Sequence, residues 1–151
     1  MQKLSVMTWN TQLYEQGNNV GERQKAIDME IFMSIVKVIQ YQLEKENSIV
    51  FAQEIPYCSN ITWREHELYT RINEIFPEKE YNVIWNMTSK NQIMMTVAIA
   101  KKGIINRDKN GFNDNRCVSI KNDILDINIM GIHAKAGDIP NYLSDIKKRF
   151  P

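Results

Sequence analysis

Cysteine is scarce in this sequence, and no stretch stays apolar for long. The 151 residues include only two cysteines, Cys58 and Cys117, at a spacing that matches no metal-binding motif. Isolated cysteines favour a reducing compartment, because disulfides persist mainly in oxidising ones. The longest apolar run is far below the ~18 residues that span a bilayer, and the N-terminus lacks the pattern of a signal peptide. We therefore expect no membrane segment and, by default, a cytoplasmic protein.

A surplus of charge of either sign is missing as well. The sequence has 19 Lys and Arg residues against 18 Asp and Glu residues, which leaves a net charge of +1. No global field therefore attracts nucleic acid or a membrane, and any binding of a polyanion must come from a local arrangement of charges. The length is that of one ordinary domain, and the hydrophobic fraction of 43% is typical of a soluble globular protein.

The most informative stretch is residues 48–54, Ser-Ile-Val-Phe-Ala-Gln-Glu. Its four consecutive apolar residues predict a short strand buried on both faces, and Pro56 is expected to end the ladder. Glu54 closes this strand, where an ionised carboxylate is costly unless it is paired or bound to a metal. Ligands of open α/β sheets also bind at the carboxyl ends of strands. Glu54 is therefore a candidate functional group; the alternative is a solvated glutamate at a strand end.

A second strand is predicted upstream, over residues 4–10, and it ends in Asn10. Between the two strands, residues 22–46 have the period of a long amphipathic helix. The apolar residues expected on its inner face are Ile27, Ile31, Ile35 and Val38/Ile39. A strand, a helix and a second strand form a right-handed unit with parallel strands. Asn10 and Glu54 are thus expected at the same edge of one sheet.

The rest of the chain favours antiparallel pairing. A capping box at residues 62–65 begins a helix that Pro77 ends, and strands are predicted at 81–87 and 94–100. Residues 117–120 and 124–132 flank Asn122-Asp123, which predicts a hairpin with a two-residue turn. A short helix is expected at 141–150. The fold class is therefore α/β (α+β), a sandwich with a mixed sheet.

The two histidines differ in context. His66 lies among glutamates on the predicted helix and is expected at the surface, whereas His133 ends the last strand. A neutral imidazole in the core is the alternative for His133. No Gly-x-Ser-x-Gly motif supports an acyl-transfer triad. A carboxylate with an amide suits Mg²⁺, which shares phosphate oxygens and keeps several waters, and a nearby histidine can move a proton. Asn10, Glu54 and His133 together point to phosphoester chemistry.

Four segments in order resemble motifs of the endonuclease/exonuclease/phosphatase superfamily, which has the deoxyribonuclease I-like fold. They are residues 7–10 (Met-Thr-Trp-Asn), 51–54 (Phe-Ala-Gln-Glu), 115–120 (Asn-Arg-Cys-Val-Ser-Ile) and 130–137 (Met-Gly-Ile-His-Ala-Lys-Ala-Gly). The pattern in this part of the sequence is an arginine, Arg116, followed by a pair of strands that runs into Ile-His-Ala. This pattern is most similar to that of the B subunits of cytolethal distending toxins. The resemblance covers essentially the whole chain.

The resemblance implies a role for each matching residue. Glu54 matches the family's magnesium-binding glutamate, and Asn10 matches an amide that helps to hold the metal and the phosphate. Arg116 matches an arginine that contacts the substrate phosphate, and His133 matches an active-site histidine beside the leaving group. The implied reaction is Mg²⁺-dependent hydrolysis of DNA phosphodiester bonds by a water attacking in line, with Asn10, Glu54 and His133 as catalytic residues.

The family's chains continue to an Asp-x-Asn and an Asp-His motif, which residues 1–151 do not contain. The resemblance therefore implies the N-terminal part of a single deoxyribonuclease I-like domain, truncated after the first half. We then expect the apolar positions of residues 94–100 and 124–132 to face water. Self-association, or a second chain that completes the fold, would cover them.

Two other functions stay open on the sequence. A chain without the further motifs could be a catalytically inactive remnant that binds a partner. The same superfamily also includes phospholipid and phosphoinositide phosphoesterases, although the apolar loop insertions of membrane-facing members are not evident here. A secreted toxin subunit is an alternative location that the resemblance implies.

Overall fold

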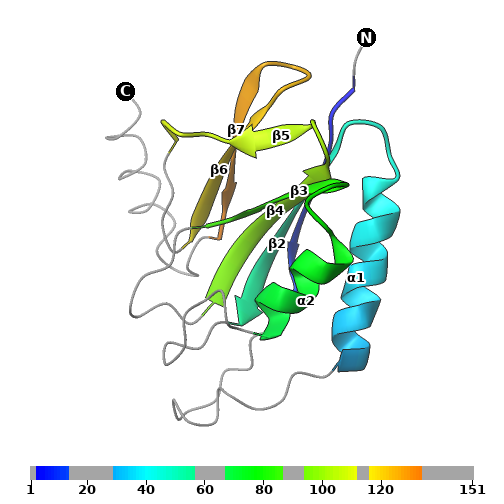
Figure 1. Cartoon of the computed structure of the whole chain (residues 1–151). Coiled ribbons are helices and arrows are strands. Elements are labelled where there is room, and N and C mark those ends of the chain that lie inside the picture. The colour runs from blue at the N-terminus through cyan, green and yellow to red at the C-terminus, as the bar shows by residue number, and fades with distance from the viewer. Residues whose placement is uncertain (1–2, 14–28, 57–66, 87–93, 112–115, 134–151) are drawn as a thin grey trace.

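The computed structural model describes residues 3–13, 29–56, 67–86, 94–111 and 116–133 (Figure 1). The predicted capping box, His66, Cys58 and the helix expected at 141–150 lie outside these residues. The elements in chain order are β1 (Ser5–Asn10), α1 (Met29–Leu43), β2 (Ser48–Pro56), α2 (Glu67–Ile75), β3 (Tyr81–Trp85), β4 (Met94–Lys101), β5 (Ile105–Arg107), β6 (Cys117–Asn122) and β7 (Ile127–Ile132).

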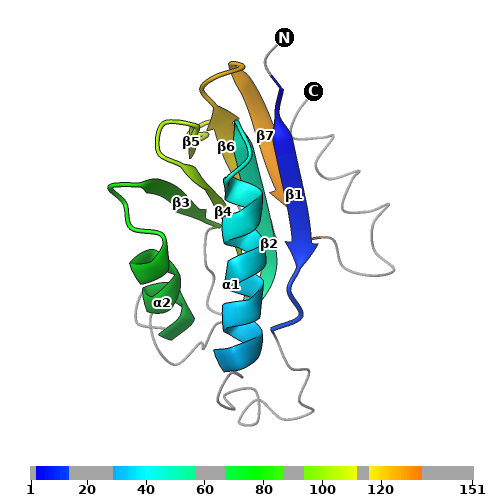
Figure 2. The same ribbon diagram turned by 90° about the vertical axis from the view of Figure 1, so that its right-hand side faces the viewer.

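The described strands form two sheets, which confirms a mixed α/β architecture. A four-stranded sheet has the order β1-β2-β4-β3, and a three-stranded sheet has the order β5-β6-β7. The pair β1–β2 is parallel, as the strand–helix–strand pattern predicts, and all other pairs are antiparallel. Helices α1 and α2 cover one face of the larger sheet and the smaller sheet covers the other, and α1 runs along β2 (Figures 1 and 2).

The alternation of side chains along β2 explains why its apolar run is continuous. Val50 and Ala52 pack toward the helices, while Ile49 and Phe51 pack toward the smaller sheet. Successive side chains of a strand point to opposite faces, so a strand covered on both faces must be apolar at every position. The predicted burial of this strand on both faces is therefore confirmed.

The expectation of a bare sheet face is wrong for β4. Its residues from Met95 to Ala100 are all buried, because the hairpin β6–β7 and the short strand β5 lie over the face that was expected to be open. Of the two segments that were expected to face water, the hairpin is the more exposed, and Ile124 and Ile127 are each 40% exposed. The described chain thus closes most of its own core with this second sheet.

The inner face of α1 differs from the prediction. Ile35 and Ile39 are buried as expected, but Ile31 is 53% exposed and Val38 is 44% exposed; Ile27 lies outside the described residues. The helix rests on a neighbouring stripe with i, i+3 and i+4 spacing, which consists of Phe32, Ile35, Val36, Ile39 and Leu43. Its last residue is Leu43 rather than position 46. Neither described helix is long and apolar enough to cross a membrane.

The predicted hairpin is present, but its turn is longer than expected. Asn122 pairs with Ile127, so four residues, not two, connect β6 to β7. Asp126 in this turn has a positive φ of 53°, a conformation that aspartate tolerates better than most residues. Asn122 is therefore part of the ladder rather than of the turn. The strand β5, which pairs with β6, was not predicted, since three residues are too few to produce a periodic pattern.

Gly131 lets the hairpin approach β2 closely. A Cβ at this position would lie 2.2 Å from Cδ1 of Phe51. We expect Gly131→Ala to lower the free energy of unfolding by about 1–3 kcal/mol, the usual cost of overpacking a core. Thermal melts would measure the loss. A double variant with Phe51→Leu should lose less than the sum of the single changes, and strictly additive losses would contradict a direct clash.

Candidate functional site

The three polar residues predicted to end strands meet in the structure. Asn10 is the last residue of β1, Glu54 lies in β2, and His133 follows β7 directly. The side-chain amide of Asn10 donates from Nδ2 to Oε1 of Glu54 at 2.8 Å. Nε2 of His133 lies 3.2 Å from the same oxygen, as an ion pair when the imidazole is protonated. The predicted convergence of Asn10, Glu54 and His133 is confirmed.

Glu54 occupies a β-bulge rather than the end of its strand. The β2–β4 register shifts between Ala52 and Ile55, and β2 then continues to Pro56, which pairs with Met94. Pro56 is thus the last residue of β2, as predicted, although it still pairs with β4 itself. Glu54 has a positive φ of 58°, which costs a non-glycine residue on the order of 1 kcal/mol. Bulges redirect side chains, and strain of this kind gathers at functional sites.

Gln53 holds the three strands together beside Glu54. Its main-chain oxygen accepts hydrogen bonds from Thr11, at 3.1 Å from the backbone N and 2.7 Å from Oγ1. Its side-chain Nε2 donates to the carbonyl of Ile132 at 2.9 Å and to Oγ1 of Thr8 at 3.3 Å. This nearly buried amide therefore fixes the residue before His133 and the loop after Asn10.

The positioning role of Gln53 was not predicted from the sequence. One feature of the sequence could have indicated this role: the amide of Gln53 directly follows an apolar run in a strand predicted to be buried on both faces. A polar group in such a place needs hydrogen-bond partners. The partners themselves lie on β1 and β7, far away in the sequence.

The loop after β1 sets the orientation of the Asn10 amide. Oδ1 of Asn10 accepts a hydrogen bond from the backbone N of Gln12 at 3.0 Å. Because Oδ1 takes this bond, Nδ2 is turned toward Glu54. Gln12 has a positive φ of 51°, a second uncommon backbone conformation near the site.

Arg116 reaches the site through its main chain. The backbone N of His133 donates to the carbonyl of Arg116 at 2.8 Å, so the start of β6 and the end of β7 are fixed side by side. The residue is half-buried. The structure thus brings the predicted phosphate-binding arginine next to His133 in the backbone, while the other three site residues meet through their side chains.

The side chains of the site are partly buried. The side chains of Glu54 and His133 are 18% and 16% exposed. An interaction between charges is stronger there than at a fully solvated surface. Both side-chain contacts of the site fall on Oε1 of Glu54, and Oε2 takes part in neither. Within the described residues, no group of three or more His, Cys, Asp or Glu side chains is placed to hold a metal ion.

Comparisons with known proteins add no assignment to this geometry: no family model, no curated protein and no solved structure matches the chain.

Proposed function

We propose that Asn10, Glu54 and His133 form the active site of a Mg²⁺-dependent phosphodiesterase that cleaves DNA. One observation carries the proposal: an amide and an imidazole from two different strands meet one oxygen of a carboxylate that is held on a strained bulge. A purely structural ion pair needs neither the bulge nor the convergence of residues from β1, β2 and the end of β7. The resemblance of the four sequence segments to deoxyribonuclease I-like enzymes supports the same reaction class.

The donor set fits Mg²⁺ in a limited way. This ion is usually held by one or two carboxylates, keeps several waters and shares oxygens of a phosphate. Oε2 of Glu54 would supply the carboxylate oxygen, because Oε1 already accepts from Asn10 and lies beside His133. Oδ1 of Asn10 accepts one hydrogen bond and retains a second lone pair. When bound, the ion would polarise the phosphoryl oxygens and neutralise charge that develops on them.

The chain's own residues would divide the remaining tasks. Glu54 holds the imidazole of His133 in place, and an oriented imidazole can donate a proton to a leaving oxygen or accept one from water. The second ring nitrogen, Nδ1, is not used in the contact with Glu54. Arg116, whose main-chain carbonyl accepts a hydrogen bond from the backbone N of His133, would supply a guanidinium that pairs with phosphate oxygens.

Plasmid nicking by the full chain tests this function. We expect conversion of supercoiled DNA to the open circular form in the presence of Mg²⁺ and no conversion with EDTA. A parallel incubation with phosphoinositide vesicles should release no phosphate. Release from vesicles without nicking would favour a phospholipid phosphoesterase, and inactivity toward both substrates with Mg²⁺ present would contradict the proposal.

A further inference from the structure

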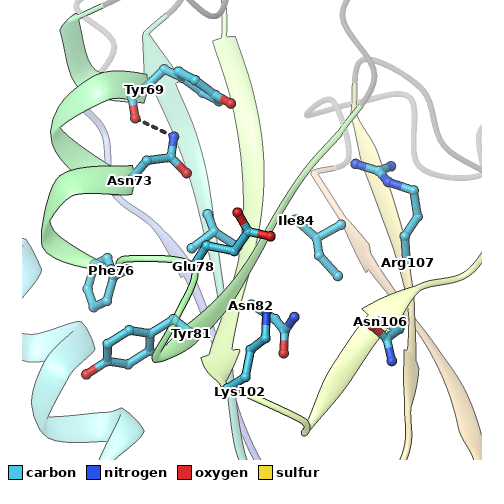
Figure 3. A pocket seen from close by; sticks show the side chains of 11 residues that line it. Tyr69, Asn73, Phe76, Glu78, Tyr81, Asn82, Ile84, Lys102, Asn106 and Arg107 are labelled. Carbon is cyan, nitrogen blue, oxygen red and sulfur yellow. Dashed lines mark hydrogen bonds between the residues drawn. The ribbon is translucent and has the colours of Figure 1, made fainter.

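A hollow of about 480 Å³ lies along β3, away from the candidate site (Figure 3). In the described part of the chain, β3 is an outer strand of the four-stranded sheet. One wall of the hollow consists of Tyr69 on α2 and Phe76 directly after this helix, and β5 forms the other wall, with Arg107. The hollow is therefore placed where one more strand would extend the sheet.

The hydrogen bonds of β3 show which backbone groups face this hollow. Lys102 N donates to the carbonyl of Glu80, and Asn86 N donates to the carbonyl of Thr96. In an antiparallel ladder, hydrogen-bonded pairs alternate with pairs that are not hydrogen-bonded. The even-numbered residues of β3 thus bond to β4, and the N–H and C=O groups of the odd-numbered residues, including Val83, point outward.

Two of the outward groups are already occupied, and they bracket Val83. The backbone N of Tyr81 donates to the carbonyl of Pro77 at 2.9 Å. At the other end, Nη2 of Arg107 donates to the carbonyl of Trp85. Both main-chain groups of Val83 lie between these two bonds. A strand edge of this kind can receive main-chain hydrogen bonds from an extended peptide.

The two walls differ in chemistry. The α2 side is aromatic, with Phe76 packed edge-on against Tyr81 at a ring distance of 5.2 Å. The other side carries the cations Arg107 and Lys102, and Glu78 is the single carboxylate among the described residues that line the hollow. Burial lowers the pKa of the Arg107 guanidinium, which still stays charged at neutral pH. A carboxylate there would offset the loss of hydration.

We propose that the β3 groove, the hollow between α2 and β5, binds an extended acidic peptide that pairs with Val83 as an added strand. Alternate side chains of such a strand point to opposite walls. An apolar side chain would pack against the half-buried ring of Tyr69. The next side chain, an aspartate or glutamate, would face Arg107 and Lys102.

Fluorescence anisotropy with short labelled peptides tests the charge preference. A peptide alternating valine and aspartate should bind at least about tenfold more tightly than one alternating valine and lysine. Lys102→Gln and Arg107→Gln should each weaken binding of the acidic peptide several-fold. Arg71→Gln is the matched control, because Arg71 is exposed on α2 beside Glu74 and outside the groove. Equal binding of both peptides, or no saturable binding, would overturn the proposal.

Amide hydrogen exchange of the full chain tests the position. We expect the acidic peptide to slow exchange at Val83 and to leave the amide of Val6, on the exposed outer strand β1, unchanged. Protection at Val6 instead would place the peptide on the wrong edge. Displacement of the peptide by free aspartate at the same concentration would show a simple anion site and would also overturn strand addition. Neither measurement depends on nicking activity, so the two proposals can fail separately.

Discussion

Glu54→Gln is expected to reduce Mg²⁺-dependent nicking by at least about 100-fold, since loss even of groups that support metal ligands costs 10–100-fold. Glutamine keeps the length of the side chain, and its carbonyl oxygen can still accept from Asn10. The substitution therefore removes the negative charge while the backbone of the bulge can stay as it is. Plasmid nicking at equal protein concentration, with thermal melts alongside, would measure the effect.

Glu74→Gln is the matched control for this variant. Glu74 carries the same charge, but its side chain is 59% exposed on α2, where it pairs with Arg71. This variant should nick like the parent protein. Equal activity of Glu54→Gln and the parent would remove Glu54 from the active site. A parallel loss in Glu74→Gln would point to a general effect of charge on DNA binding.

Asn122→Leu is expected to lower the free energy of unfolding by about 3 kcal/mol, because it breaks buried hydrogen bonds that join β6 to the residue before β2 and to the turn between β4 and β5. Asn122 is fully buried, and its Nδ2 donates to Oδ1 of Asn47 at 3.0 Å and to the carbonyl of Ile104 at 3.3 Å. Its Oδ1 accepts from the backbone N of Leu125 at 2.9 Å. Leucine has a similar volume but leaves these partners without hydrogen bonds.

The expected loss for Asn122→Leu corresponds to a fall in melting temperature of roughly 6–12 °C for a chain of this size. Asn128→Leu is the control, since Asn128 lies in the same hairpin but is exposed. Its melting temperature should stay close to that of the parent. Equal shifts in the two variants would show that the buried network around Asn122 does not stabilise the fold.

The sequence predicted the core of the site because simple rules apply there. A continuous apolar run indicated burial of β2 on both faces, and the intervening helix required β1 to lie parallel to it. Those two facts place Asn10 near Glu54 without any knowledge of the side chains. The predicted end of the last strand added His133, although nothing in its local pattern excluded a core imidazole.

The bulge at Glu54 could not be predicted in the same way. A positive φ is common for glycine and asparagine, so a glutamate in a strand gives no local signal of it. The hydrogen bonds of Gln53 to Thr8 and Ile132 could not be predicted from the sequence either, because they join residues that are 45 and 79 positions apart. Both features depend on how three strands meet, which is a property of tertiary structure.

The wrong expectation of a bare sheet came from the resemblance rather than from the residues. It treated the second sheet as missing, whereas the hairpin of β6 and β7 folds over Phe51 and covers β4. Gly131 gives a physical reason, because the absence of a side chain there lets β7 approach the Phe51 ring. The expectation of a two-residue turn was also wrong. Asn122 is buried in the strand ladder, where it pairs with Ile127 and its side chain donates a hydrogen bond to Asn47.

Calorimetric titration with Mg²⁺ tests the central claim, that Glu54 belongs to a metal-dependent site, most directly because it needs no substrate. We expect weak but saturable binding to the parent and to Glu74→Gln, since one carboxylate gives Mg²⁺ few fixed oxygens. Glu54→Gln should show no binding. Identical titration curves for the parent and Glu54→Gln would contradict the account.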